Sequence, residues 1–206
     1  MEMMMKLASI FFTMILVENY VLVKFLGICP FLGVSKKLDS AVGMSLAVTF
    51  VMVMATAATW PIYTFILSPE WAVGTDRDLG YLQTIVFILI IAILVQLLEN
   101  FLKKFIPSLY KALGVYLPLI TTNCTILGVT ILNLDNGYNF IESIVCAAGA
   151  GIGFLVAMVL FSGVRRRVEQ AQPPKCFQGL PITLVAAAMV SLSFMGFGGI
   201  VEAIFG

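Results

Sequence analysis

The chain has 206 residues, of which 61% are hydrophobic and only 11% are charged, and its formal net charge is +1. Soluble domains carry about 25% charged residues, so this composition excludes an ordinary water-soluble domain and indicates an integral membrane protein. The near-neutral charge argues against nucleic-acid binding, and the absence of histidine removes the commonest general base and the commonest metal ligand.

Six apolar segments are predicted to cross the membrane, since each has the roughly 20 residues that a spanning helix needs. The first, residues 7–35, contains Glu18 and Lys24 and is therefore irregular. The other five are free of Asp, Glu, Lys and Arg, and they are residues 40–69, 79–98, 112–134, 143–164 and 176–201. The expected fold is all-α, with residues 1–206 forming a single membrane domain.

Basic residues alternate between the connecting loops, and this alternation sets the orientation because cytoplasmic loops carry the excess of Lys and Arg. The loops after segments one, three and five contain Lys36, Lys37, Lys103, Lys104, Lys111, Arg165, Arg166, Arg167 and Lys175. The loops after segments two and four contain one basic residue, Arg77, beside Glu70, Asp76, Asp78 and Asp135. Both termini are therefore expected on the outer side of the membrane.

Two of the four cysteines stand in matching sequences. Residues 29–34 read Cys-Pro-Phe-Leu-Gly-Val and residues 124–129 read Cys-Thr-Ile-Leu-Gly-Val, so both contain the motif C-x-x-L-G-V. Each copy lies in the first segment of a three-segment half, residues 1–105 or 106–206. Because three is odd, the second half enters the membrane from the opposite side, as in the inverted repeats of many transporters. About a pseudo-twofold axis, the two motifs would approach each other near the bilayer centre.

Glycine and proline residues near both cysteines predict that segments one and four are interrupted helices. The residues concerned are Gly27, Pro30, Gly33, Gly114, Pro118 and Gly128. Proline removes a backbone donor and glycine permits dihedral angles that other residues avoid. Broken backbone at membrane depth is tolerated only where protein or a cavity satisfies it. The alternative is a pair of ordinary kinks, because Gly and Pro are frequent in membrane helices.

From the residues alone, Cys29 and Cys124 have three interpretations: inert packing residues, a disulfide, or thiolate ligands of a metal. An iron–sulfur cluster normally takes four protein ligands, as does a closed zinc site. Two thiolates would therefore form half of a site, and a second chain would complete it. Cys146 begins a run of small residues, 146–153, that suits close helix packing, and Cys176 lies in a basic loop, so neither is expected to be a ligand.

Charges in or near membrane segments are costly and often functional. Glu18 and Lys24 are six positions apart, so they would not share a helix face well. Both could be functional; alternatively, Glu18 lies near the outer interface and the Lys24 side chain extends to an interface. Glu99 is predicted to pair with Lys103, four residues later, at the inner interface. The sequence contains no phosphate-binding loop, no dinucleotide fingerprint and no C-x-x-C run, so no flavin or nucleotide site is expected in this chain.

Three stretches carry a resemblance to a known family: residues 21–37, VLVKFLGICPFLGVSKK, residues 117–129, LPLITTNCTILGV, and residues 193–199, SFMGFGG. They resemble the membrane subunits shared by Rnf electron-transport complexes and sodium-pumping NADH:quinone oxidoreductases. The sequence around Cys29 is more similar to the Rnf branch of this family, and within that branch to the A-type subunits. The resemblance covers essentially the whole chain.

The resemblance implies a subunit of an ion-translocating ferredoxin:NAD⁺ oxidoreductase in a bacterial or archaeal cytoplasmic membrane, where electron transfer drives Na⁺ or H⁺ transport. In this family the two motif cysteines bind a 2Fe-2S cluster. Cys29 and Cys124 would then supply two ligands, and the homologous E-type subunit, in opposite orientation, the other two. Flavins and nucleotide sites would belong to the B-, C-, D- and G-type subunits, so this chain would relay electrons without a complete active site of its own.

Two other functions remain open on the sequence. A secondary transporter would place a solute site at the midplane between the inverted repeats. Gly27, Pro30, Pro118 and Gly128 would then shape the cavity, and the cysteines would be incidental. A scaffold subunit would carry no site at all.

Overall fold

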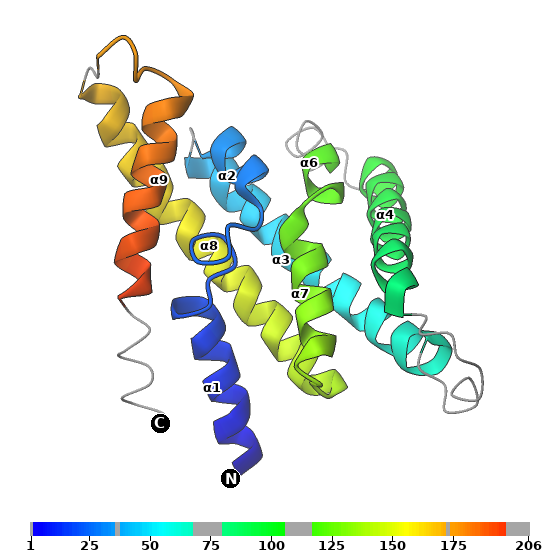
Figure 1. The fold of residues 1–206 in the computed structure, drawn as a ribbon. Coiled ribbons are helices and arrows are strands. Elements are labelled where there is room, and N and C mark those ends of the chain that lie inside the picture. Colours follow the sequence, from blue (N-terminus) through cyan, green and yellow to red (C-terminus); the bar gives the residue numbers. More distant parts are fainter. Residues whose placement is uncertain (1, 36–37, 68–79, 106–116, 172–173, 197–206) are drawn as a thin grey trace.

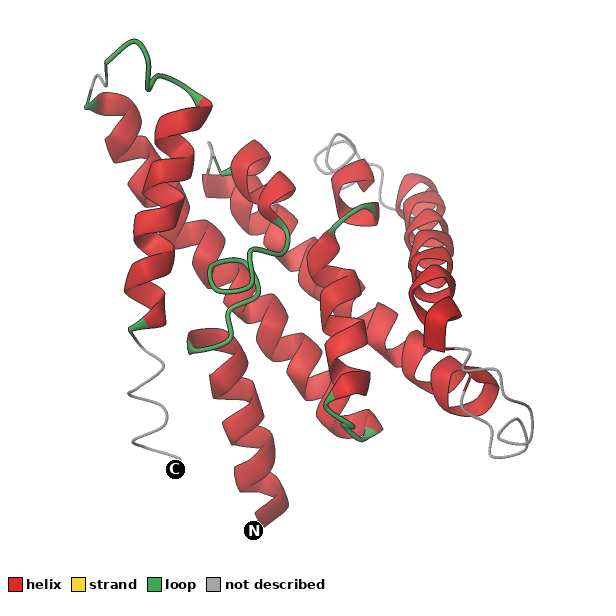
Figure 2. Cartoon of the chain, viewed as in Figure 1, coloured by secondary structure: helices red, strands yellow, loops and turns green. Residues whose placement is uncertain are grey.

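The computed structural model describes residues 2–35, 38–67, 80–105, 117–171 and 174–196. In these ranges the chain is helical and contains no strand, which confirms the all-α prediction (Figure 2). The helices are α1 (Glu2–Leu16), α2 (Ile28–Val34), α3 (Leu38–Ile62), the π-helical segment η1 (Tyr63–Leu67), α4 (Gly80–Phe105), α6 (Leu117–Thr121), α7 (Cys124–Asp135), α8 (Phe140–Gln170) and α9 (Leu180–Met195).

Two of the predicted segments are divided into half-helices. Segment one consists of α1 and α2, which are separated by the turns of residues 17–27, and segment four consists of α6 and α7, which are separated by residues 122–123. Pro30 is the third residue of α2, in the first turn, where a proline costs no helical hydrogen bond. The prediction that these two segments are interrupted is thus confirmed, while Gly114 lies outside the described residues.

Successive apolar segments run in alternating directions across the molecule, with α1 and α2 forming one segment and α6 and α7 another (Figure 1). The start of α1 lies on one side, and α9 runs toward that side and ends at about the level of the end of α1. The C-terminal ends of α4 and α8, which carry Lys103, Lys104 and Arg167 in their last turns, lie on the other side. Several loop residues used in the topology prediction lie outside the described residues, and these are Lys36, Lys37, Glu70, Asp76, Arg77, Asp78 and Lys111.

Apolar helices dominate the described structure. Two are long and apolar enough to cross a membrane, Leu38–Phe65 and Phe140–Gln170, and the shorter apolar helices are Met3–Leu16, Thr84–Asn100, Leu119–Asp135 and Leu180–Met195. Each of these helices overlaps one of the six apolar segments predicted from the sequence. The outer face of α4 exposes large apolar side chains, namely Ile85, Ile88, Leu89, Ile93 and Leu97. Such a face suits hydrocarbon better than water.

Helix α8 forms the centre of the fold, with its most extensive contacts to α3 and α1. Three glycines of α8 permit these contacts. A Cβ atom at Gly149 would lie 3.2 Å from the Phe11 carbonyl oxygen of α1, and one at Gly153 would lie 3.0 Å from the Met14 carbonyl oxygen. A Cβ atom at Gly151 would overlap Thr49 of α3. The prediction that residues 146–153 serve close helix packing is therefore confirmed, and Cys146 is fully buried among them.

Substituting Gly153 tests this packing. Gly153→Val places a branched side chain against the backbone of α1, and we expect it to lower the free energy of unfolding by about 1–3 kcal/mol, as overpacking does. Gly163→Val is the matched control, because Gly163 lies in the same helix with nothing within 4 Å of its Cβ position. Thermal unfolding in detergent measures both variants. Equal melting temperatures would show that α1 does not pack tightly on Gly153.

Candidate functional site

Asn19 organises the break between α1 and α2. Its side-chain oxygen accepts hydrogen bonds from the backbone N–H groups of Val21 (3.1 Å) and Leu22 (3.3 Å), and its Nδ2 donates to the Gly153 carbonyl oxygen at 2.8 Å. The side chain is fully buried. Asn19 thus supplies partners that the interrupted helix lacks and attaches the break to α8. The sequence interpretation did not single it out, although a buried amide in an apolar segment is a recognisable signal.

Asn123 has the corresponding role at the second break. It is the N-cap of α7, and its side-chain oxygen accepts a hydrogen bond from the Thr125 N–H at 3.1 Å. Its own backbone N–H donates to the Ile120 carbonyl oxygen at 3.2 Å. Asparagine is among the best N-cap residues, because its short side chain reaches the free N–H groups of the first turn. Each break is therefore stabilised by one buried asparagine.

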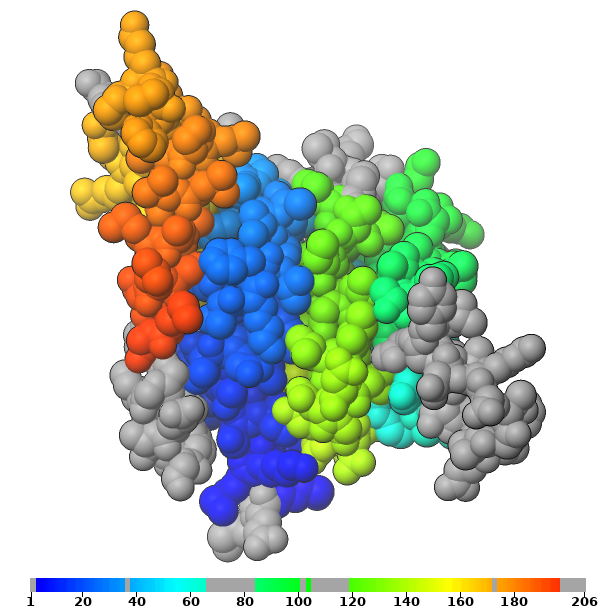
Figure 3. Space-filling view, viewed as in Figure 1, coloured from blue at the N-terminus to red at the C-terminus, as the bar shows by residue number. Residues whose placement is uncertain are grey.

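The two breaks meet at Gly27. This residue has φ +83°, in the left-handed region that favours glycine. A Cβ atom there would overlap Thr125 Oγ1 and lie 2.9 Å from Asn123 Oδ1 and 3.3 Å from the Phe154 ring of α8. Figure 3 shows α2 and α7 side by side on one face of the molecule. The structure thus places Gly27, two residues before the first C-x-x-L-G-V motif, against Thr125, the second residue of the other motif.

Cys29 and Cys124 start the two half-helices that leave this junction. Cys29 is the second residue of α2 and Cys124 is the first residue of α7, and both are exposed. All four cysteines are free, so the disulfide interpretation is not realised here. Cys176 is exposed in the connection before α9, and Cys146 is buried in the core. The described residues contain no group of three or more His, Cys, Asp or Glu side chains that would hold a metal ion.

Asn123 already pairs the first N–H groups of α7. The Thr125 N–H donates to Asn123 Oδ1 and the Ile126 N–H donates to the Asn123 carbonyl oxygen, both at 3.1 Å. Thr125 Oγ1 is buried against Gly27 and has no hydrogen-bond partner. The exposed Cys124 Sγ lies 4.0 Å from the Thr122 carbonyl oxygen, and the helix dipole places its positive end at this first residue of α7.

Glu18 and Lys24 form an ion pair across the first break. Lys24 Nζ lies 3.1 Å from Glu18 Oε2 and 5.2 Å from the centre of the Tyr20 ring. A continuous helix would separate the two charges, but residues 17–27 form turns, which fold them together. Glu99 accepts a hydrogen bond from Gln96 Nε2 at 3.4 Å, and its pairing with Lys103 stays a prediction.

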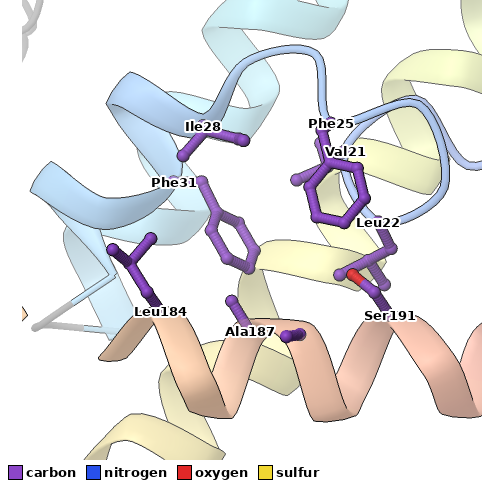
Figure 4. Close-up of a pocket in the computed structure, with 9 residues that line it drawn as sticks. Val21, Leu22, Phe25, Ile28, Phe31, Leu184, Ala187 and Ser191 are labelled. Atoms are coloured by element: carbon purple, nitrogen blue, oxygen red, sulfur yellow. The ribbon is translucent and has the colours of Figure 1, made fainter. Parts of the chain in front are cut away.

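A small apolar cavity lies between the first break, α2 and α9 (Figure 4). Its volume is about 60 Å³, and the residues that line it are Val21, Leu22, Phe25, Ile28, Phe31, Leu184, Ala187, Ala188 and Ser191. Phe25 borders it in a left-handed conformation, with φ 55°. Solute pockets are typically about 300–1,000 Å³ and contain several polar groups, so this cavity does not support a solute site.

These features define a class of protein: an apolar helical protein in which two broken helices meet at a buried, asparagine-stabilised junction and each presents a free cysteine. Comparison with known proteins identifies the family. The model of the Rnf-Nqr family, described as "Rnf-Nqr subunit, membrane protein", matches residues 7–201. The chain belongs to this family, which confirms the resemblance seen in its sequence.

Several relatives are similar over nearly their whole length. The A-type subunit of the Na⁺-translocating ferredoxin:NAD⁺ oxidoreductase complex of Acetobacterium woodii is 55% identical over 195 residues, which cover 95% of this chain and 98% of the relative. The A-type subunit of the ion-translocating oxidoreductase complex of Serratia proteamaculans is 53% identical, with 91% and 94% covered. Its counterpart of the same name from Syntrophotalea carbinolica is 50% identical, with 91% and 93% covered.

Gly27→Ala tests the junction between the two breaks. The new methyl group would meet Thr125, and alanine is disfavoured at φ +83°, so we expect the free energy of unfolding to fall by about 2–4 kcal/mol. Gly33→Ala is the control, because Gly33 lies in α2, the half-helix that follows Gly27, with nothing within 4 Å of its Cβ position. Scanning fluorimetry in detergent compares the two. A Gly27→Ala variant as stable as Gly33→Ala would contradict the contact.

Proposed function

We propose that this chain is the A-type membrane subunit of an ion-translocating ferredoxin:NAD⁺ oxidoreductase complex. In this proposal, it relays electrons across the membrane through a 2Fe-2S cluster that it shares with the homologous E-type subunit. The observation that carries the proposal is the pair of exposed cysteines, Cys29 and Cys124, at the starts of two half-helices whose neighbouring residues Gly27 and Thr125 are in contact. The names of the Acetobacterium and Serratia relatives support the redox and ion-translocating role.

The residues present fit half of such a cluster site. The chain offers two accessible thiols at one junction, and the cluster needs about four ligands, so a partner protein would supply the other two. When bound, a 2Fe-2S cluster accepts and releases one electron. Cys29 and Cys124 would hold it, the first turn of α7 would stabilise its negative charge, and Asn19 and Asn123 would keep the interrupted backbone in place around it.

The proposed membrane arrangement has six spans in two inverted halves, residues 1–105 and 106–206, each beginning with a broken segment. Six apolar helices that run in alternating directions support it (Figure 1). The basic ends of α4 and α8 would face the cytoplasm, and both termini would then lie on the outer side of a bacterial or archaeal cytoplasmic membrane. The two motif cysteines would then lie near the midplane.

The coupling of electron transfer to Na⁺ or H⁺ movement follows from the cost of charge in an apolar layer. An extra electron near the junction has little solvent to stabilise it, so its energy depends strongly on nearby charge. Entry of a cation, or a movement of one half against the other, would lower that energy. The flavins and nucleotide sites of the reaction would belong to the B-, C-, D- and G-type subunits, to which this chain passes electrons.

Serine substitutions of the two motif cysteines test the proposal on the purified complex. In Cys29→Ser and in Cys124→Ser we expect the loss of one 2Fe-2S signal in low-temperature electron paramagnetic resonance and of the iron of one cluster, because serine is a poor ligand for iron. Electron transfer from ferredoxin to NAD⁺ should fall with it. Cys176→Ser is the control, because Cys176 is a free, exposed cysteine away from the junction.

The other outcomes separate the alternatives. An unchanged signal and iron content in all three variants would contradict the cluster site. Cys29 and Cys124 would then be packing residues. Retained signal together with impaired assembly of the complex would favour a scaffold role. Retained signal with normal assembly would direct attention to a transported solute.

A further inference from the structure

A buried arginine of α8 forms hydrogen bonds with the C-terminal end of the cysteine-bearing half-helix α2. Arg165 is 7% exposed, whereas its neighbours Arg166 and Arg167 are exposed. A buried guanidinium is costly unless its donors are paired. Its position therefore requires specific partners, and they come mainly from a distant part of the chain.

Those partners are the last groups of α2 and its C-cap. Arg165 Nη1 donates hydrogen bonds to the Leu32 carbonyl oxygen and to Ser35 Oγ, the latter at 2.8 Å. Arg165 Nε donates to Glu169 Oε1 at 3.2 Å. The last carbonyl groups of a helix lack helical partners and carry its partial negative charge, so a guanidinium is well suited to satisfy them. Ser35, the C-cap of α2, is fully buried.

The contacts of α8 with segment one continue from Arg165 toward the break. One turn before it, Phe161 stacks on Phe31 of α2, with ring centres 4.2 Å apart. Further along, the Phe154 ring faces Gly27 at the start of α2. A helix of seven residues is too short to be stable alone. The position of α2 is therefore set by these contacts, at its start near Gly27 and at its end by Arg165.

We propose that Arg165 is a positioning residue, which fixes α2 against α8 and so sets the place of Cys29 relative to Cys124. Cys29 lies between the two fixed ends of α2, so release of the Arg165 end would let the half-helix shift and carry the thiol with it. This inference rests on the proposed cluster for its spectroscopic consequence. Its consequence for the thiol itself does not depend on the cluster.

The test compares Arg165→Gln, Arg165→Lys and Arg166→Gln in the purified complex. We expect Arg165→Gln to change the g values and the midpoint potential of the shared 2Fe-2S cluster. After iron removal, it should produce a several-fold rise in the alkylation rate of Cys29 relative to that of Cys124, measured by mass spectrometry in the same sample. Arg165→Lys should restore part of both values, because lysine keeps the charge but lacks the planar fork. Arg166→Gln removes the same charge from an exposed neighbour and should leave both values at wild type.

Ser35→Ala is the milder variant, because it removes one acceptor of Arg165 and keeps the buried charge. It should change the cluster signal and the alkylation ratio in the same direction as Arg165→Gln, but less. If Arg165→Gln does not assemble, Ser35→Ala and Arg165→Lys together test the role of Arg165. A wild-type spectrum and a wild-type ratio of Cys29 to Cys124 alkylation in the assembled variants would overturn the proposal. A proportional rise at both cysteines would also overturn it, since it would show a general loss of stability. If no cluster signal depends on Cys29, the proposed function fails, and the alkylation ratio still decides the role of Arg165.

Discussion

A backbone that breaks inside an apolar layer leaves N–H and C=O groups that water cannot reach, and each costs several kcal/mol if it stays unpaired. This constraint explains why the junction is built from buried amides. Asn19 and Asn123 provide the acceptors that the breaks need, and Asn19 also donates to the Gly153 carbonyl oxygen of α8. The first break is therefore attached to α8, whereas Asn123 pairs the second break within its own segment. The positions of Cys29 and Cys124 depend on these two asparagines.

Helix α8 meets its neighbours by two different means. Toward α1 and α3 it presents glycines, which bring the helix backbones close together. Toward α2 it presents Phe161 and Arg165, which reach out to a half-helix too short to hold its own position. The first kind of contact makes α1, α3 and α8 a compact core. The second attaches the cysteine-bearing half-helix to that core through a few specific side chains.

The sequence was sufficient to predict the helical class and the two interruptions, because these depend on local signals: apolar runs, and glycines and prolines such as Gly27 and Pro30. It placed helix ends less well. The charge-free run 143–164 underestimates α8, which extends from Phe140 to Gln170. Glu142 belongs to a capping box and pairs with Lys6 at 2.7 Å, and Arg165 is paired within the fold. Charge alone therefore does not end a helix when a partner is present.

The long-range partners of charged residues could not be predicted from the sequence. Nothing near Arg165 in the sequence indicates that it reaches Leu32 and Ser35, and the spacing of Glu18 and Lys24 argued against the pair that the turns allow. Only folding brings these groups together, and in the case of Arg165 it does so across the two halves of the chain. A group bound by both Cys29 and Cys124 would likewise be held by both halves. Any movement between the halves would change its ligand geometry, and by linkage any change in its charge would shift the balance between their arrangements.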